Sequence, residues 1–552
     1  MAGTLALVLT ALAFKLAAYP LLDPDEGRNA EIAREMYHQG DWLVPHLNGA
    51  PYVDKPVLYF AAGAALMHLF GPTVWAARLT SLLFTFATLT LVWTWARPRL
   101  TPAGAVVAVL ATATTPLTLA FARTVIFDAA LTTFVVLALI AFQTAIDRFD
   151  PDRPTATGWW SALAWTAIAF GVLTKGPIAL GIPLMVAIPY AAYRHRFRPI
   201  VDIVGPLIFV ALLLPWLLVM SRTAPGHLHY AIVTETLRRF STTELHRTGP
   251  WWYFLPILAA GSLPWLPIGL AEAWHRRGRP ADHDRVFLLL WIVIPLLFFS
   301  LSQSKRPQYV LPLIPPIALL AARMLSGDSR RAGTAMSAAG VGLMVVGGIL
   351  GSAPWTVPAL LDVSTEVGSA IPQVAAWLGG VSTAAGLAVV LLHRRIHVAA
   401  MILAVPVASI PLVATPLLQT IGLDRSAESL AAAIANRVGS HTPVIGVHAF
   451  PLSLPFYLRR TITVVTDDGH ELTSNYLRRN LERWSGPGTG IRRGDWWREA
   501  LRKCHNETVF VARADDLAVR STLEQTLPFL AGGGRYVAYG PCVTSRLARR
   551  AQ

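Results

Sequence analysis

Long apolar runs separated by short polar segments fill the chain up to about residue 420. Most have roughly 17 to 25 residues, the length that a helix needs to cross the hydrocarbon core of a bilayer. They lie near residues 3–19, 75–96, 104–122, 129–146, 159–174, 177–193, 201–220, 251–270, 286–301, 309–325, 333–353, 374–392 and 397–419. The pattern therefore predicts thirteen transmembrane helices.

A further apolar run at residues 57–70 is shorter and lies between Lys55-Pro56 and Gly71-Pro72. We interpret it as an interfacial or re-entrant helix. With this run left out, basic residues cluster in alternate loops, at Arg97, Arg99, Arg148, Arg153, Arg194, Arg196, Arg198, Arg276, Arg277, Arg279, Arg285, Arg330, Arg331, Arg394 and Arg395. The positive-inside rule assigns these loops to the cytoplasm. Residues 20–56, the loop 221–250 and the chain after residue 420 are then predicted on the outer face.

The pattern changes after residue 420. Short apolar runs such as VIGVHAF, TITVV, TVFVARA and RYVAYG alternate with helical patterns such as AESLAAAIANRV, as in a soluble α/β domain. We expect a transmembrane catalytic domain at 1–420, with a first outer loop at 20–74 that contains juxtamembrane helices, and an extracytoplasmic α/β domain at 421–552. Because the outer compartment is oxidising, Cys504 and Cys542 could form a disulfide.

The composition agrees with a polytopic membrane protein, since 54% of the 552 residues are hydrophobic and only 14% are charged. The opening apolar segment lacks a basic n-region, so we expect a retained helix and not a cleaved signal peptide. The net charge of +15 lies in short clusters between apolar runs, which is typical of a topology signal and argues against nucleic acid as a partner. Two cysteines in the whole chain exclude a cysteine-based zinc site.

Charged residues with helical spacing follow the first apolar run, in the stretch DPDEGRNAEIAREM at residues 23–36. Taken alone, this stretch is typical of an amphipathic interfacial helix stabilised by ion pairs. However, acidic residues cluster at its start, and Asp54 and Lys55 follow in the same loop. If a sugar leaves a lipid phosphate, the phosphate needs cationic donors and the acceptor hydroxyl needs a base. Asp25 suits the role of base because nearby basic residues favour its ionised form.

Four further stretches place polar residues at predicted outer ends of spans. They contribute Arg123, Asp128, Lys175, Glu235, Arg239, His246, Lys305, Arg306 and Tyr309. Any one of these residues could be a snorkelling or solvated side chain. Their concentration on one face favours a functional site, as does a carboxylate at the end of a transmembrane helix.

Five motifs in order carry a resemblance: DEGRNAEIAREM, DKP, ARTVIFD, LTKGP and SKRPQYVLP. They resemble the motifs of the bacterial branch of the protein O-mannosyltransferase superfamily, whose members are GT-C glycosyltransferases. Within this branch they resemble the 4-amino-4-deoxy-L-arabinose lipid A transferases. The resemblance covers residues 20 to about 320. It implies a polytopic GT-C fold with an outer α/β domain, and an inverting transfer from a polyprenyl phosphate sugar.

The resemblance also implies roles for individual residues. Asp25 matches a catalytic acid, Arg28 and Lys55 match residues that hold the lipid phosphate, and Asp128 matches a second catalytic acid that engages the donor or orients the basic pair. Lys175, Lys305 and Tyr309 match further positions around the phosphate and the lipid groove. We add Glu26, Asp54, Arg123 and His246 as candidate donor-binding residues, because they lie in the same outer stretches.

Two residues depart from the arabinose-type pattern. Asp54 stands where the pattern usually has the glutamate of Glu-Lys-Pro, and Asn29 stands where a tyrosine often follows the arginine. The motifs therefore leave the identity of the sugar and of the acceptor open. His227, His229 and His246 lack the spacing of a closed zinc site, and the family's transfer does not depend on a metal. We therefore expect no cofactor, with a divalent ion near Asp54 and these histidines as the less favoured alternative.

Together these patterns predict a glycosyltransferase of the bacterial inner membrane, with its site on the periplasmic side. It would move a sugar, 4-amino-4-deoxy-L-arabinose or similar, from undecaprenyl phosphate to lipid A or a related envelope glycolipid. The alternatives within the class are a protein O-mannosyltransferase and a cell-wall polysaccharide transferase. A flippase or transporter of lipid-linked sugars is the alternative of another class, but transporters place charged sites near the bilayer midplane.

Overall fold

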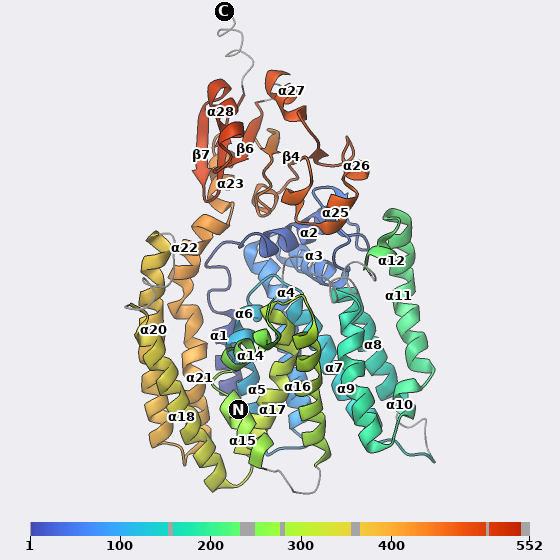
Figure 1. Cartoon of the computed structure of the whole chain (residues 1–552), viewed down its shortest axis with the longest axis vertical. Coiled ribbons are helices and arrows are strands. Elements are labelled where there is room, and N and C mark those ends of the chain that lie inside the picture. The colour runs from blue at the N-terminus through green and yellow to red at the C-terminus, as the bar shows by residue number, and fades with distance from the viewer. Residues whose placement is uncertain are drawn as a thin grey trace, which may run out of the picture. The chain divides into compact units, whose positions relative to one another are not determined.

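The structure is a computed structural model that describes residues 2–152, 158–231, 249–275, 282–354, 365–503 and 507–542. The chain divides into two compact units (Figure 1). Unit 1 comprises Met1–Leu16, Ser81–Leu218 and Leu228–Leu417, and unit 2 comprises Ala17–Thr80, Val219–His227 and Leu418–Gln552. Residues 17–80 thus share a compact unit with the C-terminal region, whereas the sequence predicted a division at residue 420. The extent of the membrane domain, 1–420, stays a prediction.

Unit 1 consists of helices. They are α1 (Ala2–Ala13), most of α4 (Val74–Ala96), α5 (Pro102–Ala113), α6 (Pro116–Ala122), α7 (Asp128–Asp147), α8 (Gly158–Lys175), α9 (Ile178–Arg194), α10 (Arg198–Val201), most of α11 (Val204–Thr223), α12 (His227–His229), η3 (Trp251–Tyr253), α14 (Phe254–Gly261), α15 (Leu266–His275), α16 (His283–Leu301), η4 (Pro307–Leu313), α17 (Ile314–Leu325), α18 (Ser329–Gly351), α20 (Thr365–Leu391) and α21 (Ile396–Val413). Within the described residues, eight helices are long and apolar enough to cross a membrane, or up to ten if each bent pair forms one span. The protein is therefore a multi-pass helical membrane protein.

The predicted number of thirteen spans is not confirmed, because several predicted spans are shorter or broken. Helix α1 ends at Ala13, and Lys15 adopts a φ of 52° that a right-handed helix cannot include. The predicted span at 104–122 is two helices bent by 66°, and the one at 251–270 bends by 109°. Pro116 and Pro264 lie at these breaks, where proline lacks the N–H that would continue a helix.

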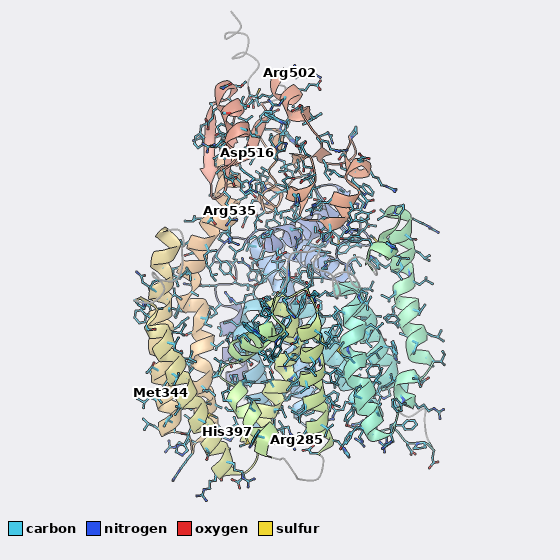
Figure 2. The ribbon with its side chains drawn as sticks, in the orientation of Figure 1. Arg285, Met344, His397, Arg502, Asp516 and Arg535 are labelled. Atoms are coloured by element: carbon cyan, nitrogen blue, oxygen red, sulfur yellow. The ribbon has the colours of Figure 1, made fainter. Side chains whose placement is uncertain are left out.

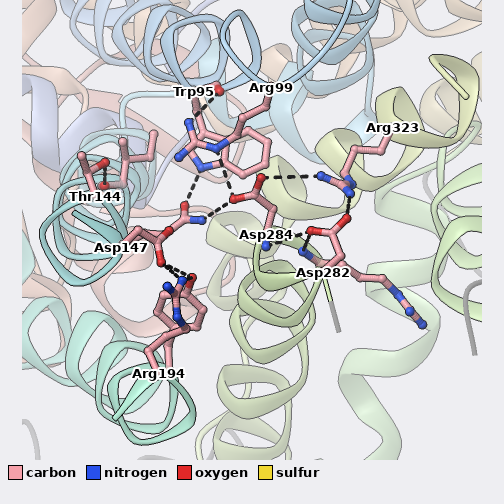
Figure 3. Close-up of polar contacts among 12 residues, drawn as sticks. Trp95, Arg99, Thr144, Asp147, Arg194, Asp282, Asp284 and Arg323 are labelled. Atoms are coloured by element: carbon pink, nitrogen blue, oxygen red, sulfur yellow. Dashed lines mark hydrogen bonds and ion pairs between the residues drawn. The ribbon is translucent and has the colours of Figure 1, made fainter. Parts of the chain in front are cut away.

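Carboxylates and arginines form two neighbouring groups of ion pairs in unit 1 (Figure 3), one with Asp147 and Arg194 and one with Arg99, Asp282, Asp284 and Arg323. We call the two groups together the arginine cluster. Arg194 at the end of α9 pairs with Asp147 at the end of α7. Arg323 in the last turn of α17 pairs with Asp282, which precedes α16. The ends of α7, α9 and α17 thus form ion pairs beside the start of α16, and the predicted sidedness of the basic loops stays a prediction.

Helix α7 separates the arginine cluster from a second polar group. It begins at Asp128 and ends at Asp147, and its 20 residues place these carboxylates roughly 30 Å apart at 1.5 Å per residue. That length is close to the thickness of a bilayer's hydrocarbon core. Asp128 and Asp147 thus lie at opposite ends of the helical layer.

Unit 2 combines the first loop of the chain with the C-terminal region. The loop forms α2 (Asp25–Gln39), β1 (His46–Leu47), β2 (Ala50–Pro51) and α3 (Leu58–Phe70). The C-terminal helices are α22 (Thr415–Arg425), α23 (Glu428–Ala435), α24 (Leu454–Leu458), η5 (His470–Leu472), α25 (Asn475–Arg479), α26 (Leu481–Trp484), α27 (Trp496–Lys503) and α28 (Leu517–Thr526). With 13 residues, α3 extends only about 20 Å, too short to cross a bilayer.

The C-terminal region forms a six-stranded sheet with the order β5-β4-β3-β6-β8-β7. Its strands are β3 (Val444–Val447), β4 (Thr463–Val465), β5 (Ile491–Arg492), β6 (Val509–Arg513), β7 (Phe529–Gly533) and β8 (Tyr536–Tyr539). The first four strands in this order are parallel, and β8 runs antiparallel to β6 and β7. Strands β3, β4, β6 and β8 fall on the predicted apolar runs, while β5 and β7 were not predicted.

The first loop is hydrogen-bonded to the edge of this sheet through Asn48. Its buried side chain donates to the carbonyl of Ile462 over 2.7 Å and accepts from the Ile462 N–H over 3.0 Å. The backbone carbonyl of Asn48 accepts a hydrogen bond from the Gly490 N–H over 3.0 Å. Asn48 therefore links the segments that enter β4 and β5, and this explains why residues 17–80 belong to unit 2.

Cys542 lies in the core of the sheet domain and is disulfide-bonded. Cys504, the other cysteine of the chain, lies outside the described residues.

Candidate active site

Helix α2 carries most of the charged residues of the first motif and is almost entirely buried. Glu26, Arg28, Glu31, Arg34 and Glu35 are all less than 10% exposed. An interfacial amphipathic helix would keep such side chains in water or among headgroups, so this alternative does not describe α2. Because buried charges need partners, each of these side chains is held by a specific contact.

Glu26 is held by Arg78 from the first turns of α4. The guanidinium donates to both carboxylate oxygens, over 2.9 and 2.8 Å, and the Leu22 N–H adds a third bond of 3.0 Å. Arg78 also donates to the carbonyls of Tyr19 and Pro20, each over 2.8 Å. These contacts make Glu26 an anchor of the loop, and its predicted part in binding the donor stays a prediction.

Asp25 and Arg28 form an ion pair on the first turns of α2. The Arg28 Nη2 lies 2.5 Å from the Asp25 Oδ1, and its Nη1 donates to the Thr473 hydroxyl over 3.2 Å. Burial opposes the charge of Arg28, but Tyr52 and the carboxylates of Asp25 and Asp54 raise its pKa above the usual value. The Asp25 side chain keeps 35% of its surface exposed, whereas Glu26, Glu31 and Glu35 on the same helix are buried. Asp25 is therefore the accessible carboxylate of α2.

Asp54 and Lys55 lie in the same unit, close to the loop that follows β4. Asp54 accepts a hydrogen bond from the Ser474 hydroxyl and one of 3.4 Å from the Tyr476 N–H. The Lys55 ammonium donates to the Asp54 carbonyl over 2.5 Å. Thr473 and Ser474 thus hold Arg28 and Asp54, respectively. We call Asp25, Arg28, Asp54, Lys55, Thr473 and Ser474 the loop cluster.

The packing of α2 explains a glycine of the first motif. A Cβ on Gly27 would lie 1.9 Å from the Asp23 Oδ1 and 2.7 Å from the Ser453 nitrogen. Asp23 accepts from the Ser453 hydroxyl over 2.9 Å, and its own N–H donates to the Arg425 carbonyl over 2.7 Å. The absence of a side chain at Gly27 therefore lets the start of the loop pack against the C-terminal region.

The burial of Asp23 predicts a dependence of stability on pH. Burial raises its pKa from 3.8 to about 7, against the lowering effect of the Ser453 hydrogen bonds. Between about pH 4 and 7 the folded protein keeps a proton that the unfolded chain has lost, so the free energy of unfolding decreases as the pH rises through this range. Asp23→Asn cannot ionise and is expected to reduce this decrease. Denaturant unfolding from pH 4.5 to 7.5 measures it, and equal pH slopes for both proteins would contradict the expectation.

A second group of predicted residues meets in unit 1, at the end of α7 opposite the arginine cluster. Lys175, the last residue of α8, forms an ion pair with the buried Asp128, and its ammonium lies 5.2 Å from the centre of the Tyr309 ring. The other carboxylate oxygen of Asp128 is buried and has no hydrogen-bond partner among the residues that the structure describes. Buried polar atoms rarely lack a partner, so this oxygen is suited to accept a hydrogen bond from a ligand.

Lys305 and Arg123 belong to unit 1 and bind backbone carbonyls. The Lys305 ammonium donates to the carbonyls of Phe299, Ser300 and Ser302 at the end of α16, and lies 5.5 Å from the centre of the Phe254 ring. Phe254 and Tyr309 stack at 6.2 Å between ring centres, which connects Lys305 to Lys175 through aromatic rings. We call Asp128, Lys175, Lys305 and Tyr309 the helix-end cluster. Arg123 donates to the carbonyls of Leu12 and Lys15 over 2.6 and 3.1 Å.

Two sequence hypotheses concern histidines. His246, predicted to bind the donor, lies outside the described residues. Among the residues that the structure describes, no group of three His, Cys, Asp or Glu side chains is arranged to hold a metal ion. The absence of a cofactor stays a prediction.

Comparison with known proteins identifies relatives of this chain. Residues 54–219 match the family described as dolichyl-phosphate-mannose-protein mannosyltransferase. A Pseudomonas fluorescens protein named undecaprenyl phosphate-alpha-4-amino-4-deoxy-L-arabinose arabinosyl transferase 1 is 35% identical over 350 residues, which are 61% of this chain and 61% of the relative. A Pseudomonas aeruginosa transferase of the same type is 34% identical over 340 residues, 60% of each chain. The resemblance to the protein O-mannosyltransferase superfamily is confirmed.

The fold agrees with this resemblance. The crystal structure of ArnT from Cupriavidus metallidurans bound to undecaprenyl phosphate matches with a TM-score of 0.85 and 24% identity over 98% of each chain. The apo structure of the same protein matches with a TM-score of 0.83. The chain therefore has the polytopic helical GT-C fold that the sequence predicted. The aligned part covers about 61% of the length of the curated relatives.

Four residues that hold the candidate site were not predicted from the sequence: Asn48, Arg78, Thr473 and Ser474. Arg78 gave a signal, since it is a lone charge within the apolar run at 75–96, and such residues are rarely without a role. Asn48, Thr473 and Ser474 gave none, because polar residues in loops are common and their contacts with distant parts of the chain are not visible in a local pattern.

Proposed function

We propose that this protein is an inner-membrane glycosyltransferase. It moves an aminopentose, 4-amino-4-deoxy-L-arabinose or a similar sugar, from an undecaprenyl phosphate carrier to lipid A or a related envelope glycolipid, with inversion at the anomeric carbon. The names of its relatives support the donor and the sugar. The observation that carries the proposal is the accessible carboxylate of Asp25, paired with Arg28 while the other acids of α2 are buried.

The transfer is a single displacement in which Asp25 acts as the base. Its carboxylate takes the proton of the acceptor hydroxyl as that oxygen bonds to the anomeric carbon, and the bond from this carbon to the phosphate oxygen breaks. The phosphate leaves with increased negative charge. Arg28 and Lys55 of the loop cluster stabilise this charge, since cationic donors are worth most where charge develops. Lys175 and Lys305 of the helix-end cluster stay predicted binding residues for the lipid phosphate.

Asp128 has a supporting part in this proposal. It holds Lys175 through the buried ion pair, and its oxygen without a hydrogen-bond partner in the described part of the chain accepts a hydroxyl of the donor sugar. Tyr309 places an aromatic face beside the Lys175 ammonium, which stabilises a cation.

The topology of the proposal follows from the charges of unit 1. The arginine cluster contains the helix ends whose loops are rich in arginine, so this end faces the cytoplasm by the positive-inside rule. The helix-end cluster then lies toward the periplasm. We place the loop cluster and the C-terminal sheet domain on that side as well, with thirteen spans in the complete membrane domain.

A transfer assay tests the proposed function. Full-length protein in proteoliposomes is incubated with lipid A and a panel of undecaprenyl phosphate sugars, and the released undecaprenyl phosphate is measured. We expect release with the aminopentose donor and little with mannose or glucose donors, together with a mass increase of lipid A. Absence of release with every donor would refute the transferase activity.

The protein O-mannosyltransferase alternative is favoured by one observation, the family match at residues 54–219. It requires a protein acceptor and a mannose donor. Release from the mannose donor only when a protein acceptor is present would support it over the proposal. The flippase alternative predicts movement of intact donor between leaflets with no release of undecaprenyl phosphate.

A further inference from the structure

A polar cavity lies at one edge of the C-terminal sheet. It has a volume of about 440 Å³ and is lined by His448, His470, Glu471, Arg513, Asp515 and Asp516; Figure 2 labels Asp516. We call it the sheet-edge pocket. Its volume falls within the roughly 300–1,000 Å³ of small-molecule sites, and all six lining residues carry polar or charged groups.

The topology of the sheet explains why the pocket lies there. His448 follows β3, His470 and Glu471 follow β4, and the remaining residues end or follow β6. These three strands are parallel neighbours, with β3 in the centre. The chain proceeds from β3 to β4 and β5 on one side and then places β6 on the other side of β3. Ligands of open α/β sheets bind at the carboxyl ends of strands where the order reverses in this way.

The side chains of the pocket are held in place by contacts with one another and with the rim. Arg513 donates to both oxygens of Asp515, over 2.9 and 2.7 Å. The His470 ring lies 2.8 Å from the Arg478 guanidinium, and Glu471 accepts from the Thr466 hydroxyl. Arg513 and Asp515 nevertheless keep 56% and 69% of their side chains exposed, so both remain available to a ligand.

The charge of the pocket selects the class of ligand. The lining has three carboxylates and one guanidinium, which with neutral histidines gives a net charge of −2. At the rim, Asp467 and Asp468 contact His448 and His470 at 3.4 Å and add negative charge, and the Arg478 guanidinium beside His470 offsets part of it. Such a lining disfavours phosphate and favours a cation. The carboxylates accept from hydroxyl and ammonium groups, and the guanidinium and the imidazoles donate to ring and hydroxyl oxygens.

We propose that the sheet-edge pocket binds an amino sugar, a hydroxyl-rich ring that carries a protonated amine. Arg513 and Asp515 bind its hydroxyl groups, and Glu471 with Asp516 binds its ammonium. This site is separate from the loop cluster and does not depend on the proposed transfer, because its chemistry follows from its own lining.

The pocket is connected to the loop cluster along the chain. His470 and Glu471 line the pocket, while Thr473 and Ser474, a few residues later in the same loop, hold Arg28 and Asp54.

Ligand binding to the full-length protein in detergent tests the proposal. Saturation-transfer NMR is recorded with glucosamine, N-acetylglucosamine and inorganic phosphate as probes. We expect glucosamine to bind, N-acetylglucosamine to bind at least tenfold more weakly because its amine is uncharged, and phosphate not to compete. Asp515→Asn and Glu471→Gln are each expected to raise the Kd of glucosamine by roughly tenfold or more, the effect of losing a charged hydrogen bond.

An exposed ion pair outside the pocket provides a matched control. Asp495 and Arg498 form an ion pair of 2.8 Å with side chains 84% and 53% exposed, and Asp495→Asn should leave glucosamine binding unchanged. Equal binding of glucosamine and N-acetylglucosamine would overturn the proposal, as would binding that the pocket substitutions do not weaken. Neither result would test the transferase activity, because that activity is measured separately by the release of undecaprenyl phosphate.

Discussion

Replacement of Asp25 by asparagine is expected to reduce sugar transfer by about 10²- to 10⁴-fold, the usual contribution of a general base. The amide keeps the size of the side chain and can still accept a hydrogen bond from Arg28, but it cannot take a proton from the acceptor. We expect kcat to fall while the KM for the donor changes little. Initial rates in proteoliposomes across a range of pH measure the effect, and the loss of rate at low pH that marks an ionised base should disappear.

The side-chain exposure of Asp25 makes this substitution informative, since 35% of its surface is accessible and its replacement should not unfold the protein. Asp495→Asn, at an exposed carboxylate of the C-terminal domain, controls for the general effect of losing one charge. Transfer by Asp25→Asn at the rate of the unchanged protein would remove Asp25 from the mechanism. A raised donor KM with unchanged kcat would assign Asp25 to the positioning of Arg28 instead.

Replacement of Arg78 by methionine is expected to lower the free energy of unfolding by about 3–5 kcal/mol, the cost of leaving one member of a buried ion pair without its partner. Arg78 is fully buried, and it binds both oxygens of Glu26 and two backbone carbonyls that precede α2. Methionine fills a similar volume but provides no donor. Denaturant unfolding of the protein in detergent, followed by circular dichroism, measures the loss.

Two further variants separate the ion pair from general effects. Arg97→Met removes an exposed arginine just beyond the end of the same helix and should change stability by less than about 0.5 kcal/mol. Glu26→Gln combined with Arg78→Met removes both charges and should recover part of the loss. If Arg78→Met is as stable as Arg97→Met, the pair does not anchor the loop.

The contacts of unit 2 suggest what the C-terminal domain contributes to the candidate site. Thr473 and Ser474 hold Arg28 and Asp54, Asn48 binds the segments that enter β4 and β5, and Ser453 binds Asp23. The sequence had placed all functional residues in the membrane domain and had assigned no role to the C-terminal region. In the structure, that region holds the loop on which Asp25 and Arg28 lie.

Local patterns in the sequence were sufficient to predict the class of fold and many of the candidate residues. Apolar runs predict helices because burying polar backbone in lipid requires internal hydrogen bonds, and alternating basic loops predict which helix ends lie together. The motifs predicted Asp25, Arg28, Asp128, Lys175 and Tyr309 as site residues. In the structure Asp25 forms an ion pair with Arg28, and Lys175 contacts both Asp128 and the Tyr309 ring. The number of spans did not follow from local patterns, since the helix end at Ala13 and the break before Pro116 depend on how neighbouring helices pack.

Only the tertiary structure decided which of these side chains are available for chemistry. Asp25 and Glu26 are adjacent in the sequence, yet Arg78, some fifty residues away, buries the second, while the first stays accessible. The sheet-edge pocket likewise depends on strand order, which no local pattern contains. The physical reason is the same in both cases: burial and ion pairing are set by residues far apart in the chain, whereas periodicity and motifs report only on neighbours.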